Sequence, residues 1–286
     1  MPTQTQGEIL DVRPAGSKFV ILSLSAPDVA DSARPGQFVT LALGGDESSM
    51  LARRAFVIHQ VQQQGVYGGS LDLAVMVRGN GSRWLSDRRR GDKLDVVGPL
   101  GKGFAIPRSG VSCVLVGSSY GGAPLHFLAQ SLRERGCRVD MLIGAIGEDD
   151  LFGLLELKRL ASILTVLTED GSVGQQGHVP SYLEEVFDRA KPDVVYACGA
   201  MPLLAGVSKM ASERRVFCQC FVETAMPCGI GVCQACVLPV TGDDGRPHIV
   251  RSCVEGPVFR GDRVRWSEIG TAPEKVLGEF DSVTTR

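Results

Sequence analysis

The sequence predicts a multidomain protein with β and α/β parts. We expect an antiparallel β-barrel over residues 1–107, a parallel α/β domain over residues 108–217 and a small module over residues 218–265. Three observations predict this. Short apolar runs separated by turn residues fill the first third, and apolar runs alternate with helical segments in the middle. Six of the nine cysteines then lie between residues 218 and 253.

Length and composition limit the class of protein. The 286 residues suffice for two or more domains, and 44% hydrophobic with 22% charged residues is ordinary for a globular chain. A net charge of -2 argues against nucleic-acid binding. No apolar run reaches the roughly 20 residues of a membrane span, and the N-terminus shows no signal-peptide pattern. We therefore expect a cytoplasmic protein whose thiols stay reduced.

Five segments of the first part are rich in Val, Ile, Leu and Phe and are separated by Gly, Pro, Asn and Asp. Such strands with turn residues between them favour a small antiparallel barrel. The segments are 18–26, 36–43, 54–61, 70–79 and 88–104, the last of which combines a turn with a strand.

The middle part alternates strands buried on both faces with helices. This alternation indicates a parallel sheet covered by helices on its faces. The expected strands are 110–119, 138–145, 163–170 and 193–200, and the expected helices are 123–136, 148–162, 181–191 and 201–212.

The third part has a cysteine pattern that needs a metal centre. Its spacing is Cys228-x4-Cys233-x2-Cys236, followed after sixteen residues by Cys253. This is the plant-type spacing for a [2Fe–2S] cluster, and the glycines between the cysteines permit a close wrapping loop. A zinc site would favour a C-x2-4-C pair at each end, and disulfides do not suit the compartment. Four of the other five cysteines are expected to be packing residues: Cys113, Cys137, Cys218 and Cys220.

Two features of the barrel segment point to a phosphate-bearing cofactor. Arg54 begins a strand and could grip a pyrophosphate, and Gly79, Gly81 and Ser82 form a turn that leads into a helix. Each feature alone is also compatible with a solvated arginine or an ordinary turn. Together, ahead of a parallel α/β domain, they suggest a flavin-binding half.

The α/β part contains a glycine loop between its first strand and helix. The loop, 117–122, stands in the context of a dinucleotide site, although it is not G-x-G-x-x-G. Gly117 and Gly121 are its expected nucleotide residues. Cys198 and Gly199 end the fourth strand, at the sheet edge where ligands bind. The acidic run 148–150 follows the second strand and would favour NADH over NADPH, or would serve as charges at a helix N-terminus.

Taken together, these motifs resemble the electron-transfer subunit of the NAD-linked (class B) dihydroorotate dehydrogenases, within the ferredoxin–NADP reductase superfamily. The resemblance covers about residues 5–265, and "GPLGKGF", "CGIGVCQACV" and "EGPVF" are its most specific stretches. It implies FAD, a [2Fe–2S] cluster and NAD(H). The implied flavin contacts are Arg54, Ala55, Phe56, Val57, Ala74, Val75, Met76, Gly81 and Ser82, and the implied cluster ligands are Cys228, Cys233, Cys236 and Cys253.

Three positions depart from the family pattern. Val57 stands where the family has a serine, so it lacks a hydroxyl for the flavin edge. The loop 117–121 reads Gly-Ser-Ser-Tyr-Gly in place of Gly-Gly-Gly-Ile-Gly, and a tail, 266–286, extends beyond the usual end.

The resemblance implies a route from NADH through FAD and the cluster to a partner catalytic subunit, most simply a flavin-containing dihydroorotate dehydrogenase in pyrimidine biosynthesis. The chain would act in a hetero-oligomer, and the sequence contains no triad or general-base pair for substrate chemistry. Two alternatives stay open. One is the same role for a hydrogenase or a ferredoxin–NADP oxidoreductase complex, and the other is a redox-sensing or zinc-organised binding module on a reductase scaffold.

Overall fold

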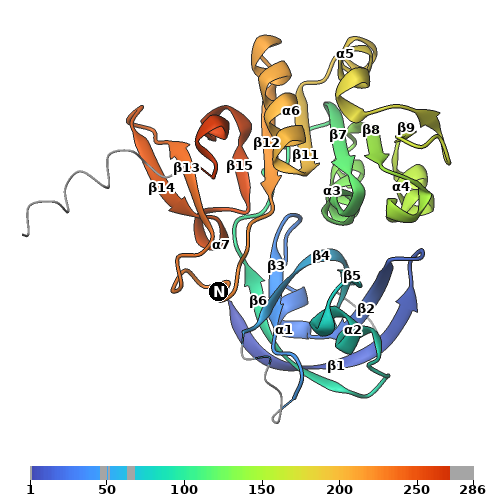
Figure 1. Ribbon diagram of the computed structural model, residues 1–286, viewed down its shortest axis with the longest axis vertical. Coiled ribbons are helices and arrows are strands. Elements are labelled where there is room, and N and C mark those ends of the chain that lie inside the picture. The colour runs from blue at the N-terminus through green and yellow to red at the C-terminus, as the bar shows by residue number, and fades with distance from the viewer. Residues whose placement is uncertain (1, 46–49, 51, 63–67, 271–286) are drawn as a thin grey trace, which may run out of the picture.

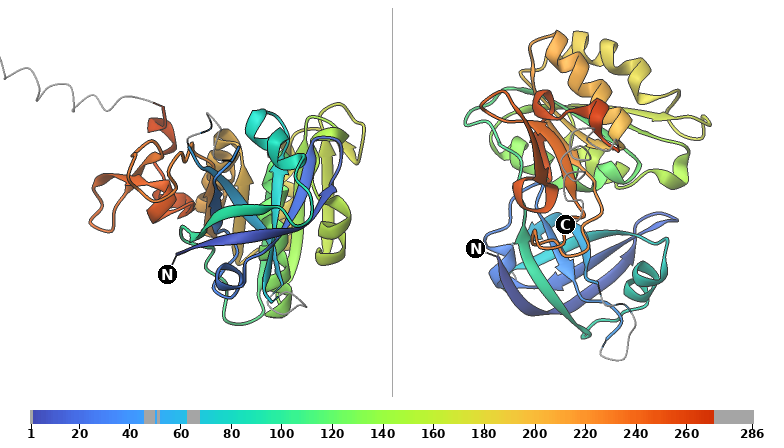
Figure 2. Two further views of the ribbon diagram at one scale, coloured as in Figure 1. Left: turned by 90° about the horizontal axis from the view of Figure 1, so that it is seen from below. Right: turned by 60° about the vertical axis from the view of Figure 1, so that its left-hand side comes forward.

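The computed structural model describes residues 2–45, 50, 52–62 and 68–270 and consists of three parts (Figure 1). The barrel lies on one side of the α/β domain, and the C-terminal module lies beside both, as the two views of Figure 2 show. Most of the predicted tail, residues 271–286, lies outside the described residues. No helix within the described ranges is long and apolar enough to cross a membrane.

The first part is a closed antiparallel barrel, as predicted, with strand order β1-β2-β5-β4-β3-β6. Alternate apolar side chains of β2 face its interior, namely Leu22 and Leu24, which are fully buried in the barrel core. The strands are β1 Thr3–Pro14, β2 Phe19–Ser25, β3 Phe38–Leu41, β4 Arg54–Gln62, β5 Ser70–Met76 and β6 Lys93–Leu100, with short helices α1 Pro27–Ala30 and α2 Asn80–Ser86.

The second part is a seven-stranded sheet of order β10-β9-β8-β7-β11-β12-β15. Its strands are β7 Ser112–Ser118, β8 Arg138–Ala145, β9 Ile163–Thr168, β10 Gln175–Gln176, β11 Val194–Gly199, β12 Phe217–Val222 and β15 Val258–Arg260. All pairs are parallel except β12 with β15. Chain order reverses direction between β7 and β11, which makes their carboxyl ends the expected ligand position.

Helices cover both faces of this sheet, because its strands are apolar on both faces. The helices are α3 Gly122–Glu134, α4 Leu154–Leu160, α5 Val179–Ala190 and α6 Met201–Glu213. α3 and α4 pack on the face that meets the barrel, where Leu115 and Met141 share a core with barrel residues such as Phe19. α5 and α6 pack on the other face, against Val114 and Val116.

The C-terminal module contains a hairpin of β13 Val237–Thr241 and β14 Pro247–Arg251, then α7 Ser252–Glu255. The boundary expected at residue 218 falls inside β12, which pairs along its length with β11. The module also returns a strand, β15, to the edge of the same sheet. We therefore propose that the module begins at residue 223, after β12.

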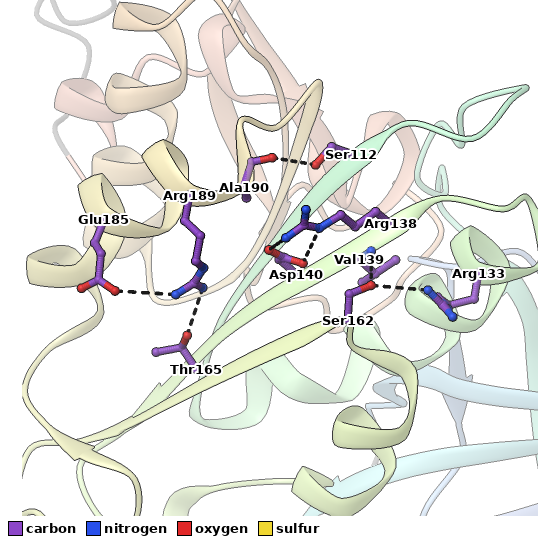
Figure 3. Close-up of polar contacts among 10 residues, drawn as sticks. All are labelled: Ser112, Arg133, Arg138, Val139, Asp140, Ser162, Thr165, Glu185, Arg189 and Ala190. Atoms are coloured by element: carbon purple, nitrogen blue, oxygen red, sulfur yellow. Dashed lines mark hydrogen bonds and ion pairs between the residues drawn. The ribbon is translucent and has the colours of Figure 1, made fainter.

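Polar contacts close the amino edge of the parallel sheet, at the start of β7, β8 and β9 (Figure 3). The Asp140 carboxylate is fully buried and accepts two hydrogen bonds from Arg138, at 3.1 and 3.0 Å. Ser112 Oγ donates to the carbonyl of Ala190 at 2.9 Å. The amino edge is thus occupied by the protein's own polar contacts, and ligands of such sheets bind at the opposite, carboxyl edge.

Candidate functional site

A cavity of about 810 Å³ opens between the barrel and the carboxyl edge of the α/β sheet. Its size lies within the range of cofactor pockets. It is lined by the barrel strands β4 and β5, the turn before α2, the ends of β7 and β11, and the segment that follows β12. Among the predicted cofactor residues, those that line it are Arg54, Ala55, Phe56, Val57, Met76, Gly81, Ser82, Gly121 and Gly199.

Four predicted cofactor residues lie behind this lining. Ala74 and Val75 are fully buried in β5, and the Ala74 carbonyl accepts a hydrogen bond of 2.8 Å from Tyr120 Oη. Gly117 packs where a Cβ atom would lie 2.9 Å from side chains of β8 and α3. Cys198 is fully buried, and burial raises the pKa of its thiol well above the usual value. Each of these four supports the wall without facing the cavity.

Gly121 of the glycine loop lies too close to β11 for a side chain. It forms the 3-10 turn η1 Ser119–Gly121, and a Cβ atom at Gly121 would lie 2.2 Å from the carbonyl oxygen of Cys198. Ser119 adopts φ +51°, a left-handed conformation that costs a non-glycine residue roughly 1 kcal/mol or more. The loop therefore keeps its tight turn although serine replaces glycine there.

Two cationic side chains line the cavity on the barrel side. Arg54 is exposed and donates to the carbonyls of Ala52, at 2.9 Å, and of Arg53, at 3.3 Å. Arg78 precedes the turn into α2, where Ser82 Oγ accepts the backbone N–H groups of Arg78 and Gly79, both at 3.0 Å. The Ser82 hydroxyl thus fixes the turn, and the two guanidinium groups can meet a diphosphate.

Among the polar cavity residues that the sequence analysis missed are the two that follow β12, Glu223 and Thr224. Thr224 Oγ1 is buried without a hydrogen-bond partner among the described residues. Glu223 lines the cavity as well, and its side chain keeps an exposed surface beside the surrounding protein. Burial raises the pKa of its carboxyl, and the positive charge of Arg78 opposes that rise. An unpartnered hydroxyl beside a carboxyl indicates that this wall is built for a polar ligand.

The acidic run after β8 contacts the barrel. It forms the 3-10 turn η2 Glu148–Asp150, where Asp149 accepts from Ser17 Oγ at 2.8 Å and Asp150 pairs with Lys18 at 2.6 Å. Ser17 and Lys18 belong to the turn between β1 and β2. Two of the three carboxylates are therefore engaged with the barrel.

The four predicted cluster cysteines converge in two pairs. The thiols of Cys228 and Cys233 interact with each other, and so do those of Cys236 and Cys253. Within the described ranges no three potential ligands surround a single metal position. Two pairs of thiols match a centre of two metal atoms, in which each metal takes two thiolates.

The loop around Cys228 already favours a thiolate. Burial acts to raise the pKa of Cys228, but the backbone N–H groups of Cys233, Ile230 and Val232 outweigh it and lower that pKa to about 6. The Cys233 N–H lies 3.4 Å from Cys228 Sγ. Gly229 and Gly231 hold φ of +70° and +81°, and a Cβ atom at Gly229 would lie 2.5 Å from Thr40 Cγ2 of the barrel. The residues present fit a cluster held by four thiolates.

Two side chains of the cavity lining also pack against cluster cysteines. Phe38 and Met226 line the cavity, and both pack in one apolar group with Cys236 and Cys253. Cys218 and Cys220 lie outside this group, buried in β12 with their sulfurs 3.8 Å apart. They are packing residues, as the sequence analysis expected.

Comparison with known proteins identifies the family. A profile of the iron–sulfur cluster binding domain of dihydroorotate dehydrogenase B matches residues 223–265. The electron transfer subunit of dihydroorotate dehydrogenase B (NAD(+)) from Desulforamulus reducens is 32% identical over 259 residues, which cover 91% of this chain and 97% of that protein. The subunit of the same name from Listeria innocua is 34% identical over 264 residues, covering 91% and 98%.

Solved structures agree with this relationship. The structure of the NADH-dependent reduced ferredoxin-NADP oxidoreductase, which gave insights into flavin-based electron bifurcation, is 30% identical to this chain. Its TM-score is 0.78, and the match covers 92% of this chain and 90% of that chain. A ferredoxin NADP+ reductase from Neisseria gonorrhoeae with bound FAD and NADP has 18% identity and a TM-score of 0.57 over 73% and 91%, a likeness of fold. The chain belongs to the family of electron transfer subunits of NAD(+)-linked dihydroorotate dehydrogenase B.

Proposed function

We propose that this chain carries electrons between NAD(H), FAD, a [2Fe–2S] cluster and the redox centre of a catalytic partner, dihydroorotate dehydrogenase in pyrimidine biosynthesis. The observation that carries the proposal is the shared packing of Phe38 and Met226. These side chains line the cavity and also contact the apolar group that contains Cys236 and Cys253. A cofactor in the cavity would therefore lie next to the cluster ligands, separated from them by apolar side chains.

The chain's own residues divide the work of holding these groups. Arg54 and Arg78 meet the diphosphate, the side chains of Phe56, Val57 and Met76 form an apolar wall, and the four cysteines of the two pairs hold the cluster. When bound, FAD accepts a hydride and releases electrons singly, which the cluster exchanges one at a time. Gly199 and the η1 turn lie at the switch point of the sheet, where we expect the nicotinamide.

A partner subunit is supported by the surface around the cluster loop. Ile230, Val232 and Val254 are exposed by 55%, 74% and 38%, and each lies within two residues of a cluster cysteine. Apolar side chains gathered at one exposed position are typical of an interface. Electrons would pass to the partner subunit through this surface. We also propose a cytoplasmic location, because four reduced thiols are needed for the cluster.

An anaerobic titration tests the proposal. Protein purified without oxygen should contain two irons and two acid-labile sulfides per chain, the stoichiometry of this cluster type. Stepwise NADH should bleach the flavin absorption first and then the cluster absorption, and a parallel titration with NADPH measures the preference between nucleotides. A colourless protein that contains zinc, or a flavin that neither nucleotide reduces, would contradict the proposal.

A second candidate keeps the cofactors and changes the partner. The likeness to the structure of the NADH-dependent reduced ferredoxin-NADP oxidoreductase, at 30% identity over 92% of this chain, favours it. Purification of the tagged chain from its own cells distinguishes the two. Recovery of a dihydroorotate dehydrogenase subunit supports the first candidate, and recovery of a larger ferredoxin-linked flavoprotein or a hydrogenase supports the second.

A further inference from the structure

One tyrosine connects the nucleotide side of the cavity to the flavin side. Tyr120 is the central residue of the η1 turn, which follows β7 and precedes α3. Its hydroxyl donates to the Ala74 carbonyl of β5 at 2.8 Å, and the backbone of Val57 in β4 interacts with the same hydroxyl. The glycine loop of the α/β domain is thereby attached to two neighbouring strands of the barrel.

The hydroxyl lies where these two strands face each other. β4 and β5 run antiparallel, with Ile58 opposite Leu73. One step further along this register, Val57 and Ala74 come to stand opposite each other. Ala74 is fully buried, and a buried carbonyl is destabilising without a hydrogen-bond partner. The tyrosine hydroxyl supplies that partner, so the loop and the strands are held together at this point.

Contacts on both sides of the loop fix the direction of the tyrosine side chain. The Tyr120 ring lies parallel to that of Phe19 in β2, with centroids 6.3 Å apart and planes inclined by 13°. The residue before it, Ser119, has a left-handed φ of +51°. The residue after it, Gly121, lies against the Cys198 carbonyl of β11. Consecutive residues therefore hold the loop to the barrel and to the sheet.

A second contact between the barrel and α3 lies behind the cavity. His59 Nδ1 of β4 lies 2.9 Å from the Ala123 carbonyl of α3, and the His126 ring of α3 interacts with the backbone of His59. Neither histidine lines the cavity, whereas Tyr120 does. Of these two contacts, the one that Tyr120 makes can therefore set the width of the cavity itself.

We propose that Tyr120 is a positioning residue for hydride transfer, because its hydroxyl fixes the nucleotide loop to the flavin wall and so sets the separation of the two rings that exchange the hydride. The nicotinamide is expected beside Gly199 and η1, and the flavin beside β4 and β5, and Tyr120 connects these two parts of the lining. A misplacement of about 1 Å between reacting groups can cost a factor of about 100 in rate. This inference rests on the proposed function and adds a residue to it.

The test compares Tyr120→Phe with Tyr196→Phe. Phenylalanine at position 120 removes the hydroxyl and keeps the ring that packs beside Phe19. Tyr196 is the matched control, because its hydroxyl also donates to a backbone carbonyl, that of Ala105 at 3.0 Å, but lies outside the cavity lining. FAD and iron contents first establish that each variant folds and loads.

Stopped-flow reduction by NADH measures the expected effect. At saturating NADH the rate of flavin bleaching should fall about tenfold or more in Tyr120→Phe and less than about twofold in Tyr196→Phe. The NADH concentration that gives half the maximal rate should change less than about threefold, because the hydroxyl holds the loop and not the nucleotide.

Two further readouts separate positioning from a general loss of stability. Deuterium at C4 of NADH slows hydride transfer, and this isotope effect should become more dependent on temperature in Tyr120→Phe, since a loosely held loop allows a wider range of distances. In the resting protein, without turnover, the backbone amides of residues 117–125 should exchange their hydrogens at least about threefold faster in Tyr120→Phe. Tyr196→Phe should match the unchanged protein in both measurements.

The outcomes separate the two proposals. If NADH reduces the flavin of the unchanged protein, but Tyr120→Phe keeps its bleaching rate, isotope effect and hydrogen exchange, the role of Tyr120 is wrong and the proposed function stands. Equal changes in Tyr196→Phe would also overturn the role, because they would show a general loosening of the fold. If neither NADH nor NADPH reduces the flavin of the unchanged protein, the proposed function fails, and the positioning role fails with it.

Discussion

Arg53 and Arg54 are adjacent in the chain, yet Arg53 is bound to the barrel while Arg54 faces the cavity. The Arg53 guanidinium donates to Thr40 Oγ1 at 3.1 Å, to the Asp95 carbonyl at 2.8 Å and to the Asp95 carboxylate at 3.1 Å. Arg54 contacts backbone carbonyls of its own segment and lines the cavity. The pair thus separates a structural arginine from one available to a ligand.

The first prediction uses these two residues as a matched pair. Arg54→Ala should weaken FAD binding about tenfold to a hundredfold, since a hydrogen bond to a charged group contributes about 1.5–3 kcal/mol. Its free energy of unfolding without cofactor should stay the same. Arg53→Ala should lower that free energy by about 1–3 kcal/mol, because it leaves partly buried acceptors on Thr40 and Asp95 unpaired. Fluorescence titration and urea unfolding measure both quantities, and equal FAD affinities for Arg54→Ala and the unchanged protein would refute the assignment.

The second prediction concerns the cysteines. Cys228→Ser and Cys253→Ser should lose the iron and the visible cluster absorption, because each removes one thiolate of a pair. Cys218→Ser should retain both, because Cys218 lies in β12 outside the pairs. Iron and sulfide analysis of anaerobically purified variants gives the result. A full complement of iron in Cys253→Ser would show that the second pair does not hold the cluster.

The third prediction is a loss of stability in mild acid, caused by His59. This side chain is 2% exposed, its Nδ1 lies 2.9 Å from the Ala123 carbonyl, and its ring lies 4.4 Å from that of His126. Burial, with a further contribution from His126, lowers the pKa of His59 from 6.5 to about 3. Below pH 6.5 the unfolded chain therefore binds a proton that the folded chain does not, until the pH approaches 3.

Linkage then fixes the sign and size of the effect. The free energy of unfolding should fall by about 2 kcal/mol between pH 7.5 and 5 on account of His59 alone. Chemical unfolding of the cofactor-free chain at several pH values measures the slope. His59→Gln should flatten it, whereas His248→Gln, an exposed position in β14, should not. An unchanged slope in His59→Gln would contradict the argument.

The fourth prediction addresses the partner. Val232→Lys should keep FAD and iron but lose co-purification with the dihydroorotate dehydrogenase subunit, because a lysine at the centre of an apolar contact is costly to desolvate. Leu155→Lys is the control, since Leu155 is 73% exposed on α4, away from the cluster loop. Equal recovery of the partner with both variants would place the interface elsewhere.

The fifth prediction tests the amino edge of the sheet. Arg138→Met should destabilise the fold by about 1–3 kcal/mol, because it leaves the fully buried Asp140 carboxylate without its partner. Arg138→Met combined with Asp140→Asn should recover part of the loss. Arg133→Met removes one 3.4 Å contact to Ser162 on the surface and should change stability by less than 0.5 kcal/mol. Unfolding of the three variants in urea decides between these values.

Local patterns made most of the fold predictable. The cysteine spacing is a local signal, and so are the apolar runs of β7, β8 and β11. β1 was missed because it lies half in solvent, with mostly polar residues that show no apolar run. β15 was missed because a strand of three residues is specified by its pairing with β12 and not by its own composition.

The site was predictable where a motif carried it and not elsewhere. Glu223 and Thr224 stand in an irregular segment, so no periodicity marks them, and only the tertiary fold brings them to the cavity. The different roles of Arg53 and Arg54 likewise depend on Asp95, which lies 42 residues after Arg53 in the chain. Ala74 and Cys198 are fully buried behind the cavity lining, so their assignment to cofactor contacts stays a prediction.

The continuity of β12 with the cluster loop has a consequence for protein engineering. The chain passes from the sheet through Glu223, Thr224 and Met226 to Cys228, and the Val222 N–H donates to the Pro257 carbonyl at 2.9 Å on the return. Grafting this segment onto another reductase would transfer part of the cavity wall together with the cluster site. The unit that can be exchanged between proteins is therefore the cluster loop together with the adjoining cavity wall. The packing contacts between the cluster and the cavity would be kept in the transfer.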